Sequence, residues 1–466
     1  MYSQFNKNNM ATITIKNVGP VKNVENLEFN KVNIFMGPQC SGKSTICKVA
    51  SYCSWVEKRI CLTQSFAFFE KENNFFNILE VFHKLKGYFR SESSIEYESD
   101  SIKFKYEHSK RQPHFEWKNR YDYYRRSKIS YIPSERNLPS VIENLLQIKF
   151  KENNILDFVI DWTDAKKVYT KESPLSILKL GVQYYYDQIS DRDIVVVDEK
   201  GTTLDLTNTS SGLQSIIPLE VVTKYLTTHI YEKNNVTKSE SDVQIAYSIK
   251  EKIYNDLFKE KNQNIVFPPE GGSMKIYVDS SGPWSIGGVP SAPIVVNEKE
   301  ELQKNHWLRI FISEEEQKKF IDKTNCFIDT QYTQLIIEEP EQNLFPSTQR
   351  DLVYHLIQLI NGGRDHRLTL STHSPYILYA LNNCMMGHLV SSQLSGEEKS
   401  EYLTNEFLSK QSWIDPKLVS VWEIEDGELR SIQDKDNIIV KNYFGQIMTE
   451  LTDEYYQMLN FYKNEE

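Results

Sequence analysis

The stretch that decides the fold reads Gly37, Pro38, Gln39, Cys40, Ser41, Gly42, Lys43, Ser44 and Thr45. It fits the pattern GxxxxGK[ST], and it lies between an apolar run at residues 32–36 and a helix-like apolar run at residues 46–56. Glycines at both ends allow a tight turn, in which backbone N–H groups and the positive end of the following helix converge on a phosphate. We therefore predict a phosphate-binding loop, and not a glycine-rich turn before an ordinary helix.

Two side chains of this loop carry its chemistry. Lys43 would direct its positive charge toward the β and γ phosphates of a nucleoside triphosphate, and the Ser44 hydroxyl would ligate Mg²⁺. We expect all nine residues of the loop to take part in nucleotide binding.

The composition predicts a soluble globular protein of two or three domains, with 466 residues, 39% hydrophobic and 25% charged. No apolar run is long enough to span a membrane, and the polar, Asn-rich first ten residues predict no secretory signal, so we expect a cytoplasmic protein. The six cysteines form no CxxC pair and have no companion histidines, which indicates reduced thiols. A net charge of −10 argues against coating nucleic acid by bulk charge, although a local basic groove stays open.

A second apolar run, at residues 335–337, ends in Glu338, Glu339, Pro340 and Glu341. We expect Glu338 to hold Mg²⁺ or its water, and Glu339 to lie beside the water that attacks the γ-phosphate.

The run IVVVDE at residues 194–199 looks the same, but Lys200, Gly201 and the short strand TTLDL follow it. We interpret it as the first strand of a β-hairpin and reject it as a magnesium site.

Two further signals are weak when taken alone. Ser210, Ser211, Gly212 and Gln214 open an apolar, helix-like run. Small hydroxyls and a glycine at a helix start form an anion site, although an ordinary helix cap has the same residues. His373 follows a buried-type strand at residues 368–372, where a lone histidine is more often structural.

The order of these motifs, together with IKNVGPVKNVENLEF before the loop, resembles the ATPase heads of the SMC, RecF and OLD kind, which belong to the ABC class. The resemblance covers residues 12–137, 194–227 and 335–466. It implies an α/β P-loop NTPase of the ABC/SMC-head type, with an antiparallel edge β-sheet and a helical lobe. It also implies ATP and Mg²⁺ as ligands, and a head-to-head homodimer, or a higher oligomer, that sandwiches two ATP molecules.

The resemblance also assigns roles to single residues. Glu339 would polarise water for hydrolysis, His373 would sense the γ-phosphate, and Asn17 would lie near the nucleotide base. Residues 210–214 would be the signature motif that contacts the ATP of the other subunit, and residues 342–345 would be the D-loop. The family's Q-loop glutamine is missing, so that Glu135 or Arg136 would have to replace it.

We expect five segments along the chain. Residues 1–137 form the first part of the ATPase core, with the Walker A loop and the edge sheet. Residues 138–192 form the helical lobe, from helical patches at 138–148, 155–162 and 174–186, and residues 193–231 form the hairpin, signature motif and helix. Residues 232–330 are an insertion that we interpret as a partner-binding region. Residues 331–466 complete the core with the Walker B strand, D-loop, switch histidine, and a terminal hairpin and helix.

Residues 110–128 are the most basic interval, and aromatic residues are interleaved with the basic ones. That composition is typical of nucleic-acid binding. A solvated strand face has the same composition, and Glu116 and Asp122 dilute the charge, which favours the structural interpretation.

The chain lacks the long coiled coil of SMC proteins. Asp434 and Asp436 follow Glu423 and Glu425 too closely for a Toprim nuclease, so any nuclease would act in trans. Such a head resembles the ATPase subunits of bacterial anti-phage defence systems such as PARIS or Septu, which hold and release an effector. We therefore predict a regulatory ATPase with a nuclease or toxin as partner. The alternatives are a RecF-like DNA repair ATPase that clamps duplex DNA, and a non-hydrolysing scaffold, which the intact Glu339 and His373 disfavour.

Overall fold

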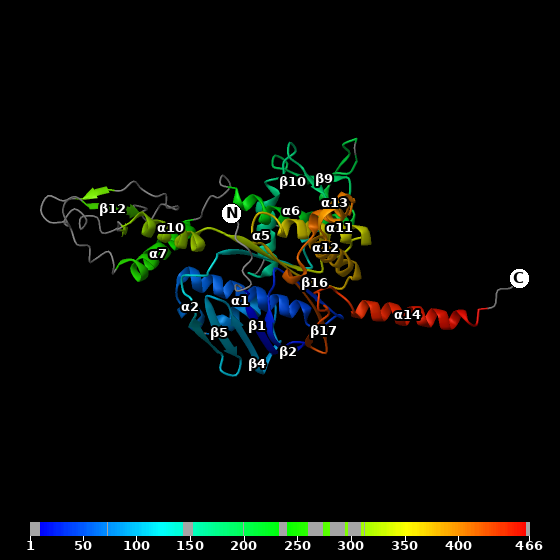
Figure 1. Cartoon of the computed structure of the whole chain (residues 1–466), viewed down its shortest axis with the longest axis horizontal. Helices are drawn as coiled ribbons and strands as arrows, with labels where there is room; N and C mark the ends of the chain where they lie inside the picture. Colours follow the sequence, from blue (N-terminus) through cyan, green and yellow to red (C-terminus); the bar gives the residue numbers. More distant parts are fainter. Residues whose placement is uncertain are drawn as a thin grey trace.

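The computed structural model describes residues 10–71, 73–142, 152–198, 200–232, 240–259, 274–279, 294–296, 309–311 and 313–462. An 11-stranded sheet forms its centre, in the order β6-β5-β4-β1-β2-β18-β17-β3-β16-β15-β7 (Figure 1). Five neighbouring strands are parallel: β17 (Val419–Glu425), β3 (Val32–Met36), β16 (Arg367–Thr372), β15 (Tyr332–Glu338) and β7 (Ser127–Ile132). Their carboxyl ends therefore meet at one edge of the sheet.

The parallel strands are apolar on both faces because helices cover both faces. In β3, Val32 and Ile34 belong to one core cluster and Phe35 belongs to the other. Helix α1 (Lys43–Thr63) packs on the Phe35 side. The opposite side is covered by α5 (Asn154–Lys166), α6 (Ser211–Thr227), α11 (Pro346–Ile360) and α12 (Pro375–Gln393).

The antiparallel edge sheet predicted from the sequence is present. It consists of β1 (Thr12–Val18), β2 (Val21–Glu28), β4 (Phe89–Glu98), β5 (Ile102–Glu107) and β6 (Gln112–Trp117). Strand β18 (Glu428–Ser431) pairs with both β2 and β17 and so joins the edge strands to the parallel strands. Two short helices, α2 (Ala67–Glu70) and α3 (Asn74–Phe82), pack their aromatic residues into the same core as α1. The expected α/β P-loop fold of the ABC/SMC-head type is confirmed.

The lobe contains helices and also a four-stranded sheet. Its helices are α4 (Leu138–Val141), α5 and α6, and its strands are β8 (Leu175–Ile177), β9 (Val182–Asp187), β10 (Arg192–Val196) and β11 (Thr203–Asp205). The predicted helix at residues 174–186 is wrong, because Gly181 turns the chain at φ 68° and the following residues alternate between buried and exposed. The hairpin predicted at residues 194–205 is confirmed.

Part of the insertion packs beside α1. Helices α7 (Glu240–Leu257) and α10 (Glu314–Ile328) lie against each other, and β12 (Met274–Asp279), β13 (Ile294–Val296) and β14 (Arg309–Phe311) form a small sheet (Figure 1). The Lys252 ammonium donates a hydrogen bond to the Thr63 carbonyl at the end of α1, 2.6 Å away. The loop-rich stretches at 267–273 and 280–293 lie outside the described residues.

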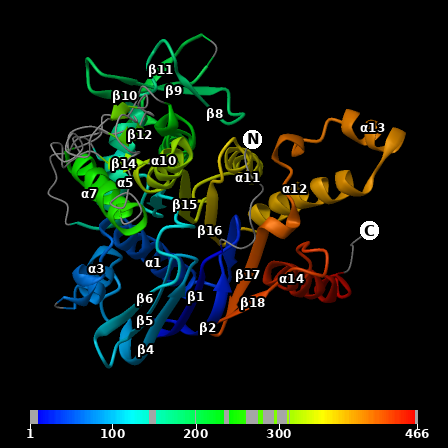
Figure 2. The same ribbon diagram turned by 60° about the vertical axis from the view of Figure 1, so that its left-hand side comes forward.

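The last part of the chain forms a hairpin, β17 and β18, and then a helix, α14 (Tyr443–Leu459), as predicted. This helix projects from the body, and none of its side chains is buried (Figures 1 and 2). The remaining elements are α13 (Gly396–Thr404) and four 3₁₀ turns at Leu206–Asn208, His229–Tyr231, Lys410–Ser412 and Pro416–Leu418. Within the described residues, every helix is too short or too polar to cross a lipid bilayer.

Candidate functional site

The phosphate-binding loop connects β3 to α1, as predicted. Gly37 and Gly42 have φ angles of 145° and 112°, which side-chain-bearing residues rarely adopt. A Cβ atom on Gly37 would lie 2.6 Å from the Ile424 carbonyl oxygen, and one on Gly42 would lie 2.7 Å from Val21 Cγ2. Both positions therefore require glycine, for backbone conformation and for packing.

The N-terminus of α1 is open to an anion. The helix begins at Lys43, its first turn contains no acidic residue, and no described side chain caps its N–H groups. Free N–H groups and the positive end of the helix dipole favour a phosphate at this place. The loop thus has the backbone features that its sequence predicts.

Lys43 lies folded into the loop. Its Nζ donates hydrogen bonds to the carbonyl oxygens of Gly37, at 2.8 Å, and Pro38, at 2.7 Å. Burial lowers the pKa of Lys43 to about 8, although the nearby carboxylates of Glu339 and Glu341 favour its charged form. A phosphate in the loop would replace two neutral carbonyls by anionic oxygens, which stabilise the ammonium more strongly.

The acidic turn follows β15, at the same sheet edge as the loop. The Glu338 side chain is 5% exposed, and its Oε1 is buried without a hydrogen-bond partner among the described residues. Glu339 turns the chain at φ 45°, and its N–H donates to the Ser371 carbonyl on β16 at 2.8 Å. Its carboxylate is 40% exposed, and Glu339 Oε1 lies 3.7 Å from His373 Nε2. The structure therefore brings the predicted Glu339 and His373 together.

His373 lies where predicted, directly after β16. Burial and the positive charge of Lys43 lower its pKa, against the opposing effects of the Glu339 carboxylate and the Gly37 backbone. The imidazole is consequently neutral near pH 7, and its neighbours are the loop and the acidic turn.

Glu341 is a site residue that sequence reasoning missed. Its Oε1 accepts the backbone N–H of His373 at 2.6 Å, and its Oε2 is buried without a described partner. Burial raises the pKa of the Glu341 carboxyl, although these hydrogen bonds oppose the rise. A third carboxylate in the run of residues 338–341 was the available signal, and its function is to position the end of β16.

Arg136 braces the acidic turn. It is fully buried, and its guanidinium donates to the carbonyl oxygens of Glu338 and Glu339, both at 2.8 Å. Burial lowers its pKa to about 10. Glu135, the other residue expected to replace the Q-loop glutamine, is exposed. The guanidinium of Arg136 therefore binds the backbone of the turn.

The turn between β1 and β2 lies against the loop, as the resemblance implies. Pro20 and Val21 are the nearest neighbours of Gly42, and Asn17, at φ 54°, is exposed just before them. The expectation that Asn17 lies near a nucleotide base stays a prediction.

The signature segment lies next to the D-loop of the same chain. Ser210 caps α6, Ser211 is exposed, and Gln214 Nε2 donates to the Thr207 carbonyl at 2.9 Å. A Cβ atom on Gly212 would lie 3.1 Å from the Asn343 carbonyl oxygen. In the described chain no hydrogen bond joins residues 210–214 to residues 37–45.

The residues around the loop fit Mg²⁺ and a triphosphate. Buried polar atoms without a described partner lie on the loop and on the adjoining strand ends: Ser41 Oγ, Glu338 Oε1, Glu341 Oε2 and Ser371 Oγ. Such atoms are rare in folded proteins and indicate a missing ligand or water. Mg²⁺ binds through one or two carboxylates together with phosphate oxygens, and Ser44 and Glu338 provide a hydroxyl and a carboxylate for it.

The basic interval at residues 110–128 is mostly neutralised by neighbouring carboxylates. The ion pairs are Lys110–Glu107, Lys118–Glu98, Arg120–Asp256, Arg125–Asp365, Arg126–Asp242 and Lys128–Asp161. Six of its seven basic residues thus have acidic partners, which favours the structural interpretation over a nucleic-acid surface.

The two rejected acidic pairs are turn residues. Asp198 is exposed, and its carboxylate accepts hydrogen bonds from the Thr202 N–H and hydroxyl. Asp434 Oδ1 accepts the N–H groups of Asp436 and Ile438. These hydrogen bonds of Asp198 and Asp434 are all made within their own turns; Glu199 lies outside the described residues.

No protein-family model matches the sequence, and no curated protein is significantly similar to it. Solved structures align with most of the chain at low identity. An SMC head domain from Thermotoga maritima is 7% identical over 93% of this chain and 100% of its own, with a TM-score of 0.33. The recombination mediator RecF with ATP is 13% identical over 92% of this chain and 100% of its own, with a TM-score of 0.28. An Smc head from Pyrococcus furiosus, bound to the C-terminal domain of ScpA, is 9% identical over 96% of this chain and 99% of its own, with a TM-score of 0.28. Because these TM-scores are low, we base the fold assignment on the strand order of the sheet and on the phosphate-binding loop, and not on these alignments.

Proposed function

We propose that this protein is an ATPase of the ABC type, which dimerises around Mg-ATP and regulates a separate effector protein. The observation that carries the proposal is the meeting of three charged or polar groups at one sheet edge. Lys43, Glu339 and His373 come from three different elements; the Glu339 charge raises the pKa of both Lys43 and His373, and the Lys43 charge lowers that of His373. They provide a phosphate ligand, a carboxylate for water and a γ-phosphate sensor.

Each residue has a separate task in hydrolysis. Lys43 leaves the carbonyls of the loop and binds the β and γ phosphates of ATP. The half-exposed Glu339 carboxylate accepts a hydrogen bond from the attacking water and orients it. Neutral His373, which Glu341 positions through its backbone N–H, donates to the γ-phosphate. Mg²⁺, when bound, neutralises phosphate charge, and Glu338 and Ser44 would hold it.

A second copy of the chain would complete the site. The start of α6 is exposed and makes no hydrogen bond to the loop of its own chain in the described residues, so its N-terminus and two serine hydroxyls would be offered to the loop of a partner. Aromatic residues near the other motifs are exposed as well: Phe345, in the D-loop, is 75% exposed, and Tyr376 and Tyr379 are exposed on the helix that follows His373. Exposed aromatic residues of this kind are enriched in protein interfaces.

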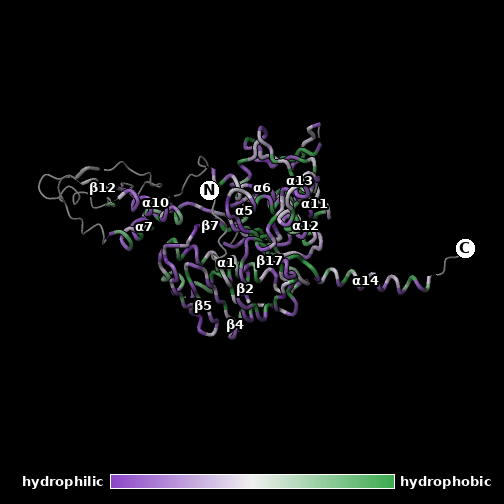
Figure 3. The backbone as a smooth tube through the Cα atoms, in the orientation of Figure 1, coloured by the Kyte–Doolittle hydropathy of each residue, from purple (hydrophilic) through white to green (hydrophobic). Residues whose placement is uncertain are grey.

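Helix α14 supports a protein effector as the second partner. Met448, Leu451, Tyr455 and Met458 are all exposed, and they recur at intervals of three, four and three residues, which places them along one face of the helix. Hydrophobic and hydrophilic residues alternate along this helix (Figure 3). Its charged residues, Glu450, Asp453 and Glu454, are all acidic. The effector would therefore present an apolar groove with a basic rim. The resemblance to anti-phage ATPase subunits makes a nuclease or toxin our choice for this effector.

The dimer is tested by the mass of Glu339→Gln in solution with ATP and Mg²⁺. We expect an ATP-dependent dimer, and expect that Ser210→Arg in the same protein keeps ATP binding but abolishes the dimer. A Glu339→Gln protein that binds ATP and stays monomeric would contradict the proposal.

The effector surface is tested by purification from the native host. Leu451→Glu combined with Tyr455→Glu should lose a stoichiometric partner, while Thr449→Glu, on the opposite face of α14, should retain it. The DNA-clamp alternative predicts instead that duplex DNA stimulates ATP turnover with a steep salt dependence. The paired charges at residues 110–128 disfavour that alternative.

A further inference from the structure

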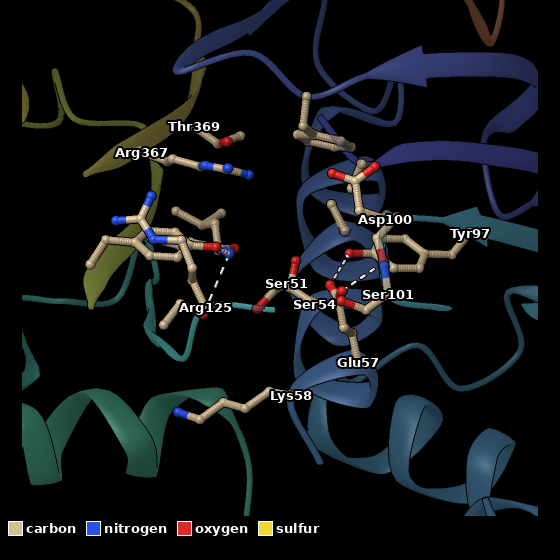
Figure 4. Close-up of a pocket in the computed structure, with 18 of the residues that line it drawn as sticks. Ser51, Ser54, Glu57, Lys58, Tyr97, Asp100, Ser101, Arg125, Arg367 and Thr369 are labelled. Atoms are coloured by element: carbon tan, nitrogen blue, oxygen red, sulfur yellow. Dashed lines mark hydrogen bonds between the residues drawn. The ribbon is translucent and has the colours of Figure 1, made fainter. Parts of the chain in front are cut away.

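A cavity of about 80 Å³ lies beside the middle of α1, away from the phosphate-binding loop (Figure 4). Ser51, Ser54 and Lys58 of α1 form one wall, and Arg367 and Thr369 of β16 form another. Figure 4 shows Arg367 extending from the strand side toward α1, and Lys58 extending from α1 toward the strand side. At about 1.5 Å per residue, Ser51 and Lys58 lie about 12 and 22 Å along α1 from Lys43, so this cavity is separate from the nucleotide site.

The cavity offers hydrogen-bond donors without partners. The hydroxyls of Ser51, Ser54 and Thr369 line it and make no hydrogen bond to the described residues. The Tyr124 hydroxyl is buried, lines the cavity and has no described partner. Each of these hydroxyls has a hydrogen-bond donor available for a ligand that accepts hydrogen bonds.

Acceptors in the cavity are few. The Glu57 carboxylate already accepts hydrogen bonds from the Tyr97 and Ser99 hydroxyls, both at 2.6 Å. Burial raises the pKa of Glu57, which favours its neutral form. Asp100 Oδ2 is the acceptor in the lining that is buried without a described partner. Donors therefore outnumber free acceptors.

The charge of the lining is also positive. Lys58, Arg125 and Arg367 line the cavity together with Glu57 and Asp100, so that the lining side chains carry one more cation than anions even when both carboxyls are ionised. Arg125 is paired with Asp365 outside the cavity lining, whereas Lys58 makes no ion pair within 4 Å in the described chain. Burial, with Arg126 and Lys128 nearby, lowers the pKa of Lys58 to about 7, against the opposing effect of the Asp242 and Asp161 carboxylates.

We propose that this cavity binds a small oxyanion, of the size of phosphate or a short carboxylate, between Lys58 and the hydroxyls of α1 and β16. The volume accommodates one such anion, or a few waters, and is too small for a nucleotide. Phosphate and carboxylate share the property that the cavity would recognise, because the anionic oxygens of both accept several hydrogen bonds from hydroxyls and cations.

The test is calorimetric titration of the full chain carrying Lys43→Ala, which weakens binding of phosphate in the nucleotide loop. Inorganic phosphate and acetate are titrated separately, and the tighter of the two identifies the class of anion. We expect one site per chain, and a loss of affinity of about tenfold or more when Lys58→Met is added, since a charged hydrogen bond is removed. Lys48→Met on the same helix is the matched control and should change the affinity less than about twofold.

Circular dichroism shows whether each variant is folded. If Lys58→Met unfolds the chain, Ser54→Ala and Thr369→Val provide the test, each with an expected loss of about three- to tenfold. The proposal would be overturned if neither anion gave a heat of binding or raised Tm at concentrations up to about 20 mM, which is above the millimolar Kd of a weak site. Binding that neither Lys58→Met nor the two hydroxyl variants weakens would also overturn it.

Discussion

Two strands of this protein end in nearly the same sequence, but the acidic residues that follow them lie in different structural settings. Residues 335–339 at the end of β15 read LIIEE, and residues 194–199, which begin in β10, read IVVVDE, so that in both an apolar run is followed by two acidic residues. β15 lies between β16 and β7 in parallel register, so its carboxylates emerge at the sheet edge beside the phosphate-binding loop. β10 lies in an antiparallel sheet of the lobe, and Asp198 bonds to Thr202 in a hairpin turn. The position of the strand in the sheet, and not the acidic pair, determines whether a magnesium site can form.

The largest effect should come from removing the cation that faces β15. Lys43→Ala removes the ammonium that binds the β and γ phosphates, and ATP affinity should fall by about a hundredfold or more, because a buried charge-assisted contact is lost. Fluorescence titration with a labelled ATP analogue measures this. Wild-type affinity in this variant would show that the loop is not the nucleotide site, and the comparison of the two strands would fail.

The burial of Lys43 should also make ATP binding depend on pH. Lys43 has a pKa of about 8 in the free protein and binds phosphates in its protonated form. Affinity should be highest below pH 8 and should weaken by about tenfold between pH 7 and pH 9, as the lysine loses its proton. The same titration over this pH range tests the prediction. A flat profile would mean that Lys43 stays protonated or does not contact ATP.

Removing the brace of the turn should have a moderate effect. Arg136→Met leaves the carbonyls of Glu338 and Glu339 buried without donors, at a cost of about 2–4 kcal/mol. Tm should fall by several degrees, and ATP turnover should fall in the folded protein, because Glu339 loses its fixed position. Arg136→Lys, which keeps the charge but not the planar fork, serves as the matched variant and should be intermediate. Unchanged stability in Arg136→Met would contradict the bracing role.

The smallest effect is expected at the other strand. Asp198→Ala removes two hydrogen bonds in an exposed turn, which should cost about 1 kcal/mol or less. ATP affinity and turnover should stay within about twofold of wild type, since this turn is part of the lobe sheet. A large loss of turnover would mean that the β10 hairpin contributes to the site, contrary to our interpretation.

Much of the site could be predicted because its motifs are local. The loop, the two carboxylates of β15 and His373 each follow a buried strand, and parallel strands carry their ends to one edge. The roles of Glu341 and Arg136 could not be predicted, because they depend on hydrogen bonds between elements about 30 and 200 residues apart. The cavity beside Lys58 could not be predicted either, since residues from separate strands and helices line it.

The fold was predicted least well where local patterns compete. The run at residues 174–186 has enough apolar residues for a helix, but Gly181 and the aromatic residues that follow it favour a hairpin. The sequence of residues 232–330 has too little hydrophobic periodicity to predict its helices and strands. In the structure, α7 and α10 pack against each other there, and α7 lies beside α1.

The most direct test of the account is single-turnover ATP hydrolysis by Glu339→Gln, with Asp198→Asn as the matched control. The account predicts that Glu339→Gln binds ATP as wild type does but hydrolyses it about a thousandfold more slowly, because the water loses its carboxylate partner. Asp198→Asn should hydrolyse ATP at the wild-type rate. Hydrolysis by Glu339→Gln at the wild-type rate would contradict the assignment of β15 as the catalytic strand.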